Sequence, residues 1–507
     1  MGNATPSPPR LHEFIRTGRM VEAHRPWPRC LVSAEQWRLA IDGLATGTWT
    51  LLGLWGEANQ VHMALNDMAH GEVCVLTLGC EDRRFPSVGR LHPPAIRLER
   101  ALRDLWSLDP DGLDDVRPWL DHGRWQHPPS VAPRVPDAYA FLPTEGESLH
   151  QIPVGPVHAG IIEPGHFRFT ANGETVVRLE ARLGYVHKGI ERLMAGMPVE
   201  RAAALAGRVS GDSTVAYALA FARALEAAHG IEVPPRATWL RALMAELERL
   251  ANHLGDIGAV CNDAAFAMMH AQCGHLREQI LRVADACFGH RLMMDRVVPG
   301  GVERDLQRDG EKQVHSLLVQ IRRRFPELVE LYDNTASLQD RTVGTGVLSP
   351  ALVRQYGCGG YVGRASGRCF DARRTPGYPP YDTLKFEVPV LEDGDVNARL
   401  WIRIREVEQS VTLIDQIVQQ LPRGPIHELA TLRTSEPSEG VALVEGFRGD
   451  VLVWLRADAE GSIERCHLRD PSWFQWPLLE AAIEGNIVAD FPLCNKSFNC
   501  SYSGHDL

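Results

Sequence analysis

The segment Arg236–Leu254 has the clearest periodicity in the chain. Apolar side chains recur there at three- and four-residue steps, at Leu240, Leu243, Met244, Leu247, Leu250 and Leu254. This spacing puts them on one face of an α-helix, and Pro234-Pro235 marks its start. Further helices are expected at Pro198–His229, Ala271–Phe288, Arg308–Ser337 and Asn397–Gln420. The pattern predicts a large region that is mainly helical.

A β-hairpin is expected just before these helices. The extended runs His166–Thr170 and Thr175–Leu179 flank Asn172-Gly173, a dipeptide typical of tight hairpin turns. A further strand region is expected near Val441–Leu455.

The first part of the chain reads as a small α+β domain. Residues 1–30 are rich in Pro and Arg and are expected to be loosely ordered, while Thr48–Trp55 and Val73–Leu78 read as strands and Ala95–Pro110 as an amphipathic helix. Residues 127–148 are Pro-rich and polar, as in a linker. We therefore predict an α+β protein with a domain at 1–147 and a mainly helical domain at 148–507.

Composition excludes several kinds of protein. The net charge of −11 over 507 residues argues against nucleic acid as a partner. No apolar run is long enough for a membrane-spanning helix, and the first twenty residues lack the apolar core of a secretory signal. The eleven cysteines include no C-x-x-C pair, so we expect free thiols in a reducing compartment and no zinc ribbon or iron–sulfur motif in this chain.

Ordered motifs run through the second domain. They include G-P-V-H (155–158), E-P-G-H-F-R (163–168), Y-V-H-K-G-I-E (185–191), R-V-S-G-D-S (208–213) and, at the end of the chain, S-F-N-C-S-Y-S-G-H-D-L (497–507). This series resembles the large subunit of membrane-bound, group 4 nickel–iron hydrogenases and the related 49-kDa quinone-site subunit of respiratory complex I.

The first domain resembles the 30-kDa subunit of complex I, through F-P-S (85–87) and the residues that follow it. These are Glu99, Asp104, Leu105, Arg117 and Trp125. The resemblance therefore implies a fused 30-/49-kDa-like chain.

The chain departs from the hydrogenases at the metal ligands. Four thiolates hold the nickel–iron centre in that family, in two C-x-x-C pairs, whereas the aligned positions here are Ser210, Ser213, Ser501 and Gly504. A neutral hydroxyl is a hard ligand and cannot replace a bridging thiolate. Cys500 lies one residue out of register and Cys494 lies before the motif, so we expect no nickel–iron centre.

Two further positions depart from the relatives. Tyr217 stands where the hydrogenases carry a histidine, and Gly211 where complex I carries a tyrosine thought to donate to the quinone. The resemblance nevertheless implies that the pocket walls persist as a quinone-type cavity.

The resemblance also nominates site residues, each with a simpler alternative. Glu191, Arg208, Asp212 and Arg448 are the catalytic candidates, and His158, His166, Ser210, Ser213 and Ser501 are the candidates for lining the cavity. The alternatives are a structural Glu191–Arg208 ion pair, helix capping by the two serines after Val209, a surface turn at Asp212, a loop hydrogen bond from Arg448, and histidines that only hold turns. Cys500 is expected to be an ordinary buried thiol.

The predicted function is that of a subunit in a membrane-associated, complex I-like assembly related to energy-converting hydrogenases. We expect a small iron–sulfur subunit to supply the cluster and antiporter-like subunits to lie in the membrane. We expect this chain to bind no cofactor of its own, with a quinone as the candidate ligand, and to lie peripherally on the cytoplasmic face of the membrane. Two alternatives stay open. One is quinone reduction with NADH upstream as the electron donor, which would make the chain an oxidoreductase subunit, and the other is a catalytically inactive scaffold.

Overall fold

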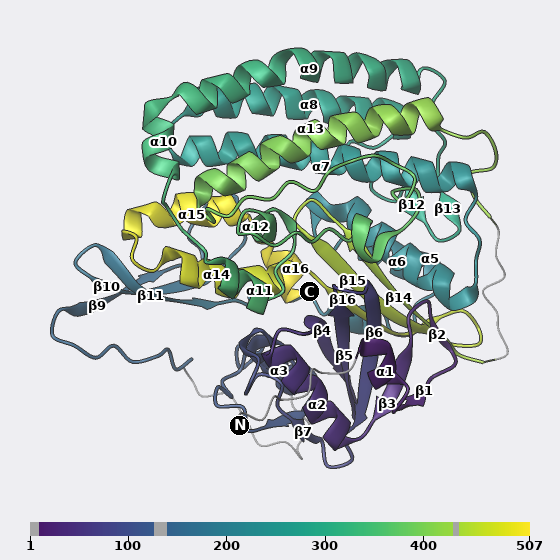
Figure 1. Ribbon diagram of the computed structural model, residues 1–507, viewed down its shortest axis with the longest axis vertical. Helices are drawn as coiled ribbons and strands as arrows, with labels where there is room; N and C mark the ends of the chain where they lie inside the picture. The colour runs from purple at the N-terminus through teal and green to yellow at the C-terminus, as the bar shows by residue number, and fades with distance from the viewer. Residues whose placement is uncertain (1–9, 126–138, 429–435) are drawn as a thin grey trace, which may run out of the picture. The chain divides into compact units, whose positions relative to one another are not determined.

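The computed structural model describes residues 10–125, 139–428 and 436–507 (Figure 1). The chain divides into two compact units, Met1–Ala140 with Arg354–Gly357, and Phe141–Val353 with Cys358–Leu507. Both helices and sheets are present, which confirms the α+β class.

The first unit is built on a five-stranded sheet in the order β1-β3-β6-β5-β4. These strands are β1 (Arg19–Met20), β3 (Arg29–Val32), β6 (Glu72–Gly79), β5 (Gln60–Asp67) and β4 (Thr50–Glu57). The three longest pair antiparallel and their central residues are buried, because their apolar runs are covered on both faces. The strands expected at Thr48–Trp55 and Val73–Leu78 are thus confirmed.

Short elements complete this unit. They are α1 (Leu11–Ile15), β2 (His24–Arg25), α2 (Ala34–Ala45), β7 (Arg84–Pro86), η1 (Pro93–Ala95), α3 (Ile96–Trp106) and β8 (Asp109–Asp111). Residues 11–30 therefore hold regular elements, so the expectation of loose order is wrong for them, because Leu11, Phe14 and Ile15 are buried and tie this segment down. Residues 1–9 and most of the expected linker, 126–138, lie outside the described residues.

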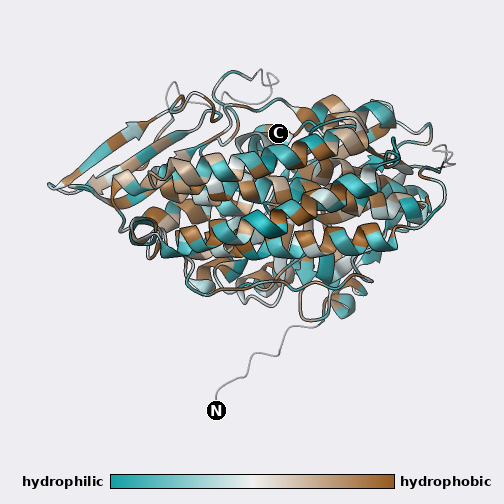
Figure 2. Ribbon diagram, turned by 90° about the horizontal axis from the view of Figure 1, so that it is seen from above, coloured by the Kyte–Doolittle hydropathy of each residue, from teal (hydrophilic) through white to brown (hydrophobic). Residues whose placement is uncertain are grey.

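Four long helices of the second unit pack against one another. They are α7 (Pro235–Asp263), α8 (Ala267–Phe288), α9 (Gly310–Asn334) and α13 (Val396–Gln420), at the top of Figure 1. All six stripe residues predicted on α7 are fully buried. Figure 2 shows the hydrophobic and hydrophilic residues alternating along these helices, as expected when only part of each helix faces the core.

The helix expected at Pro198–His229 is broken in two. The observed elements are α5 (Val199–Ala206) and α6 (Thr214–His229), with the short η2 (Gly211–Ser213) between them. Gly207 ends α5 and Ser210 has an extended backbone (φ −143°, ψ 122°), so the helical hydrogen-bond ladder stops there. The helix expected at Arg308–Ser337 likewise ends at Asn334, and α10 (Ala336–Thr342) follows.

The predicted hairpin is present and gains a third strand. β10 (His166–Asn172) pairs with β11 (Thr175–Arg182) around Gly173, whose φ of 58° is in the left-handed region. On its other side β10 pairs antiparallel with β9 (Leu149–Val154). The sheet packs on the C-terminal helices through aromatic contacts, such as Phe167 and Phe169 with Phe491.

A β-meander lies under α6. Its strands are β14 (Ser438–Glu445), β15 (Asp450–Ala457) and β16 (Ile463–Arg469), of which the first two confirm the strand region expected near Val441–Leu455. At Gly440 a side chain would collide with the Ala224 carbonyl of α6, so glycine permits the close approach of helix and strand.

The remaining elements of the second unit are short or C-terminal. They are α4 (Ile190–Met194), β12 (Val297–Val298), β13 (Gly301–Val302), α11 (Pro350–Gln355), α12 (Gly360–Arg364), η3 (Arg373–Gly377), α14 (Ser472–Ile483), η4 (Val488–Asp490), α15 (Phe491–Phe498) and α16 (Tyr502–Asp506). Among the described residues, no helix combines the length and apolar character needed to cross a membrane.

Candidate functional site

The two ends of the predicted pocket meet in the structure. The hydroxyl oxygens of Ser210 and Ser501 lie 3.1 Å apart although 291 positions separate them in the chain. Ser501 caps α16 by accepting from the Gly504 amide at 2.8 Å, and both serines are buried. The break between α5 and α6 and the start of α16 therefore form one junction.

Asp212 and Arg448 form an ion pair at this junction. The guanidinium donates to Asp212 Oδ2 at 2.6 Å, while the hydroxyls of Ser210 and Ser213 donate to Oδ1 at 2.6 and 3.1 Å. Burial would raise the pKa of Asp212, but the charge of Arg448 and the hydrogen bonds from Arg448, Ser210 and Ser213 together outweigh it and hold this pKa below its ordinary value. The carboxylate is thus ionised at neutral pH.

One of the simpler alternatives is wrong for this segment. Neither Ser210 nor Ser213 caps a helix with its side chain, because both hydroxyls are turned to the carboxylate between them. Asp212 does lie in a short turn, Gly211–Ser213, with a side chain that is one-third exposed (33%), and it is also held by the buried Arg448.

Arg448 is fixed from several sides. It is 3% exposed, its Nε donates to the Asn499 carbonyl at 2.6 Å, and its guanidinium lies 4.6 Å from the centre of the Phe447 ring. Burial opposes the charge, but Asp212 and Asp470 together with other nearby groups outweigh it and keep the pKa of Arg448 well above the ordinary arginine value. A permanent positive charge therefore occupies the centre of the junction.

A second hydrogen-bonded carboxylate, that of Asp470, lies next to the serine-lined junction. Tyr217 donates to Asp470 Oδ2 at 2.5 Å, and burial beside this carboxylate raises the pKa of the phenol well above its usual value. The same oxygen lies so close to Gly504 that any side chain there would collide with it. The position aligned with the fourth thiolate ligand is thus closed to a cysteine unless Asp470 moves.

The residues of the junction do not fit a nickel–iron centre. They offer hydroxyls, a carboxylate and a guanidinium, whereas such a centre needs soft thiolates. A cation placed between Ser210 and Ser501 would also lie near the charge of Arg448. Among the described residues, no three His, Cys, Asp or Glu side chains come together as a metal-binding group.

The two displaced cysteines do not restore a thiolate set. Cys494 and Cys500 are buried, and burial raises the pKa of the Cys494 thiol to about 11 and that of the Cys500 thiol well above its ordinary value. Both are therefore protonated thiols at neutral pH, and neither stands at an aligned ligand position.

Glu191 and Arg208 do not pair with each other. Glu191 accepts hydrogen bonds from Arg465 and from the His467 ring, both at 2.8 Å. Burial would raise the pKa of Glu191, but Arg465 and His467 together outweigh this effect and lower the pKa to about 2. Arg208 makes a bidentate pair with Asp295, at 2.7 Å for both bonds, on the surface. The ion-pair alternative joining the two is wrong because each has a nearer partner from another segment.

The two histidines differ in their position. His158 is hydrogen-bonded to the Pro156 carbonyl at 3.1 Å and to the Tyr502 hydroxyl at 3.3 Å, which brings it next to Ser501. Both ring nitrogens of His166 are engaged by the Gly155 carbonyl and by Arg168, at 3.2 and 3.3 Å. Of these two histidines, His158 is the one that contacts the C-terminal segment through a hydrogen bond.

The Y-V-H-K-G-I-E element holds the end of the chain in place. The amides of Lys188 and Gly189 donate to Leu507, at 2.6 and 3.0 Å, and His187 is bonded to the Asp506 carbonyl at 2.7 Å. This anchoring explains how two motifs far apart in sequence form one site.

The sequence alone does not single out Glu248, Asn252 and Asp470. The first two lie one turn apart on α7, where Asn252 donates to the Asp212 carbonyl at 2.7 Å and Glu248 accepts from the Val215 and Ala216 amides at 2.7 and 3.1 Å. Asp470 follows β16. In the sequence they read as ordinary charged or polar residues, although the place of Glu248 next to Leu247 in the apolar stripe is a signal of its burial.

Two known protein families match the two segments that meet at the junction. The family described as "Respiratory-chain NADH dehydrogenase, 49 Kd subunit" matches residues 263–441 and 430–506, and the family described as "Nickel-dependent hydrogenase" matches residues 188–255.

Three similar proteins show how far the likeness extends. Formate hydrogenlyase subunit 5 of Escherichia coli (strain K12) is 32% identical over 461 residues, 87% of this chain and 80% of its own length. An NADH-quinone oxidoreductase subunit of Syntrophobacter fumaroxidans is 30% identical, over 69% of this chain and 94% of its own. A chain of the membrane-bound sulfane sulfur reductase, an archaeal respiratory membrane complex, superimposes with a TM-score of 0.67 at 26% identity, over 71% of this chain and 99% of that one.

The first of these matches is longer than the second unit alone, so it extends into the N-terminal unit. The chain belongs to the large-subunit family shared by group 4 nickel-dependent hydrogenases and the 49-kDa subunit of respiratory NADH dehydrogenase, in its form fused to a 30-kDa-like N-terminal region.

Proposed function

We propose that this chain is a peripheral subunit of a membrane-bound, complex I-like redox complex, and that its site works without a nickel–iron centre. The observation that carries the proposal is the junction itself, where the two ends of the family's metal pocket meet through hydroxyl groups and an Asp212–Arg448 ion pair. In this proposal the site keeps the position of the family's metal pocket, but it acts through hydrogen bonding and proton transfer.

Such a junction is suited to bind a polar group and to handle protons. Arg448 supplies a fixed positive charge, and the hydroxyls of Ser210 and Ser213 supply protons that can be redirected from Asp212 to a bound oxygen. The carbonyl oxygen of a quinone is one acceptor of this kind. Reduction of a carbonyl consumes protons as well as electrons. A subunit without a metal centre can therefore contribute by supplying the protons at this site.

Electrons have to come from elsewhere. The described residues hold no cluster-binding group of cysteines, so we propose a small iron–sulfur partner that brings a cluster within reach, and antiporter-like membrane subunits that use the released energy. We propose that the chain is a peripheral subunit and that it lies on the cytoplasmic face of the membrane. The similarity to formate hydrogenlyase subunit 5 and to a chain of a respiratory membrane complex supports this setting.

Purification of the tagged chain from membranes of its own host tests the proposal. We expect a small iron–sulfur protein and antiporter-like subunits to copurify, and detergent to release the complex from the membrane fraction. A chain recovered alone from the soluble fraction, with no such partners, would contradict it.

The same preparation separates the two alternatives. Quinone reduction in these membranes, lost in Arg448→Ala and reduced in His158→Ala, would favour a quinone site, since His158 contacts the C-terminal segment through Tyr502. His166→Ala is the matched control, because its ring nitrogens bond to Gly155 and Arg168 instead. Intact complex function in the Arg448 variant would favour the scaffold.

A further inference from the structure

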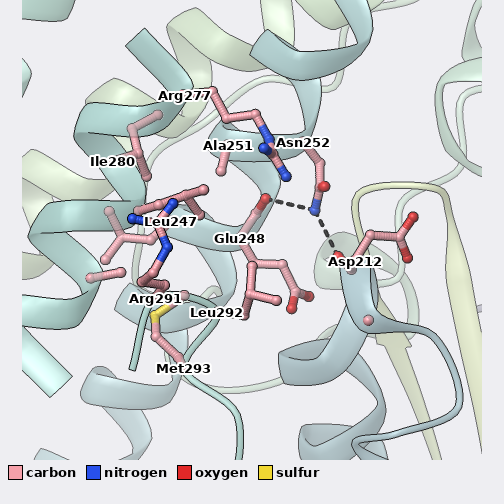
Figure 3. Close-up of a pocket in the computed structure, with 13 residues that line it drawn as sticks. Asp212, Leu247, Glu248, Ala251, Asn252, Arg277, Ile280, Arg291, Leu292 and Met293 are labelled. Carbon is pink, nitrogen blue, oxygen red and sulfur yellow. Dashed lines mark hydrogen bonds between the residues drawn. The ribbon is translucent and has the colours of Figure 1, made fainter. Parts of the chain in front are cut away.

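Two hollows are lined by residues of the break between α5 and α6. The hollow towards α7 and α8 has Glu248 and Asn252 in its lining, with Leu247 and Ala251 beside them (Figure 3). The space open to the centre of a water molecule there is about 20 Å³, enough for one water. The second hollow, here called the α5 cavity, is bounded by Gly207 at the end of α5 and has a volume of about 550 Å³. Of the two, the α5 cavity has room for part of another molecule.

The buried part of the α5 cavity is apolar. Val199 and Ala203 of α5, Ala218 of α6 and Val297 of β12 line it and are buried. Two of these four side chains are single methyl groups, and Gly207 has none, so the space that longer side chains would fill stays open. An apolar side chain that entered here would be removed from water, which favours its binding.

Three carboxylates stand at the exposed rim of the α5 cavity. They belong to Glu200 of α5, to Glu303 after β13 and to Glu428, and all three residues are exposed. Within the described residues, none of these side chains forms a hydrogen bond or an ion pair. Their negative charges are therefore available to a cation outside the chain.

The other charged groups of the lining already have partners. The carboxylate of Asp295 is held by two hydrogen bonds from Arg208, both at 2.7 Å. Arg296 donates to the Gly289 carbonyl at 3.1 Å, and the ring of His427 is bonded to a backbone carbonyl, also at 3.1 Å. Three free carboxylates and one guanidinium remain, so the rim carries a surplus of negative charge.

Backbone contacts hold the walls of the α5 cavity in place. The Glu428 amide donates to the Gly300 carbonyl at 2.9 Å, and a side chain at Gly300 would collide with the Glu428 carbonyl, so these two segments pack closely. The Glu303 amide donates to the Arg296 carbonyl, also at 2.9 Å. A cavity with fixed walls needs little ordering when it binds, which lowers the free-energy cost of association.

We propose that the α5 cavity is a docking surface for a basic segment of a partner subunit. One apolar side chain of that segment fills the buried part, and flanking lysine or arginine side chains pair with Glu200, Glu303 and Glu428. An apolar centre within a charged rim is the usual anatomy of a protein interface. A second copy of this chain is a poor occupant, because it has the same net charge of −11. The inference rests on the proposed function, since the partner is a subunit of that complex.

Photo-crosslinking in the purified, membrane-derived complex tests the docking surface. The photoreactive residue p-benzoyl-phenylalanine replaces Glu303 at the rim, and the matched control carries it in place of Val319, which is 51% exposed on α9. We expect the probe at position 303 to crosslink to a segment of another subunit in which an apolar residue is flanked by lysine or arginine, as mapped by mass spectrometry. No crosslink, a crosslink to a second copy of this chain, or the same crosslink from the control would overturn the proposal.

Retention of the crosslinked subunit gives an independent readout. Glu200→Lys with Glu303→Lys should lower its retention about tenfold, because like charges across an interface repel each other. Glu311→Lys with Glu330→Lys, at exposed positions of α9, changes the net charge equally and should leave retention unchanged. Changing the crosslinked lysine or arginine to glutamate should restore retention in the first variant. Equal retention in the two variants, or no restoration, would refute the docking surface.

The same preparation separates this inference from the proposed function. Iron–sulfur and antiporter-like subunits that copurify without the crosslink would refute the docking surface alone. A crosslink to a basic segment in a preparation that lacks those subunits would refute the proposed function and keep the docking surface.

Discussion

Replacing Asp212 by asparagine should destabilise the second unit far more than an ordinary surface charge change. Arg448 is 3% exposed and would lose the only carboxylate with which it forms an ion pair in the described structure. Leaving a buried charge unpaired costs about 3–5 kcal/mol. Because Asp212 is one-third exposed, solvent screening reduces this cost, and we expect about 2–4 kcal/mol. For a unit of this size the melting temperature should fall by roughly 3–5 °C, measured by differential scanning calorimetry.

The pair Arg208–Asp295 supplies the control for this prediction. It has similar bond lengths, but both side chains are 43% exposed, so Asp295→Asn should cost less than about 1 kcal/mol. The double variant Asp212→Asn with Arg448→Met should lose about 2 kcal/mol less than the sum of its single changes. Equal effects of Asp212→Asn and Asp295→Asn, or strict additivity in the double variant, would refute the reasoning.

Three further outcomes follow from the structure. Gly504→Ala should lower stability by about 1–3 kcal/mol in thermal unfolding, because its methyl group collides with Asp470; an unchanged melting temperature would show that Asp470 yields freely. Glu191→Gln should destabilise at neutral pH, and since the pKa of Glu191 is lowered from 4.5 to about 2, this difference should be full above pH 4.5 and vanish as the pH falls through 2; a constant difference would contradict the assignment. Glu248, with its pKa raised from 4.5 to about 8, should make the native state lose stability as the pH rises between these values, and Glu248→Gln should flatten this slope in urea titrations; an unchanged slope would count against the burial argument.

The parts of the fold predicted correctly depend on local sequence. The α7 stripe follows from spacing alone, and the hairpin from Asn172-Gly173 between β-forming residues. β9 is not predictable in this way because Pro153 and its polar neighbours do not read as a strand, and its pairing depends on β10 lying beside it. The break between α5 and α6 is also hidden, because single glycines such as Gly207 do not by themselves stop a helix. Here tertiary contacts of Asp212 with Asn252 and of Ser210 with Ser501 accompany the break.

Pairings across long distances in the chain cannot be predicted from local sequence. Asp212 and Arg448 are each candidates from the resemblance, but nothing local shows that they bond to each other across 236 positions. For the same reason the sequence suggests Arg208 as a partner of Glu191, and the structure gives it Arg465 and His467. Glu248 shows the limit most clearly, because a buried acid and a surface acid look alike until the neighbouring helices are in place.

Metal analysis of the purified, membrane-derived complex tests the central claim most directly. Cells should be grown with ample nickel, and nickel and iron should be measured per copy of this chain by inductively coupled plasma mass spectrometry. A junction of hydroxyls around Asp212 and Arg448 predicts iron from the partner's cluster and only trace nickel. One nickel per chain would contradict the claim, whichever residues held it.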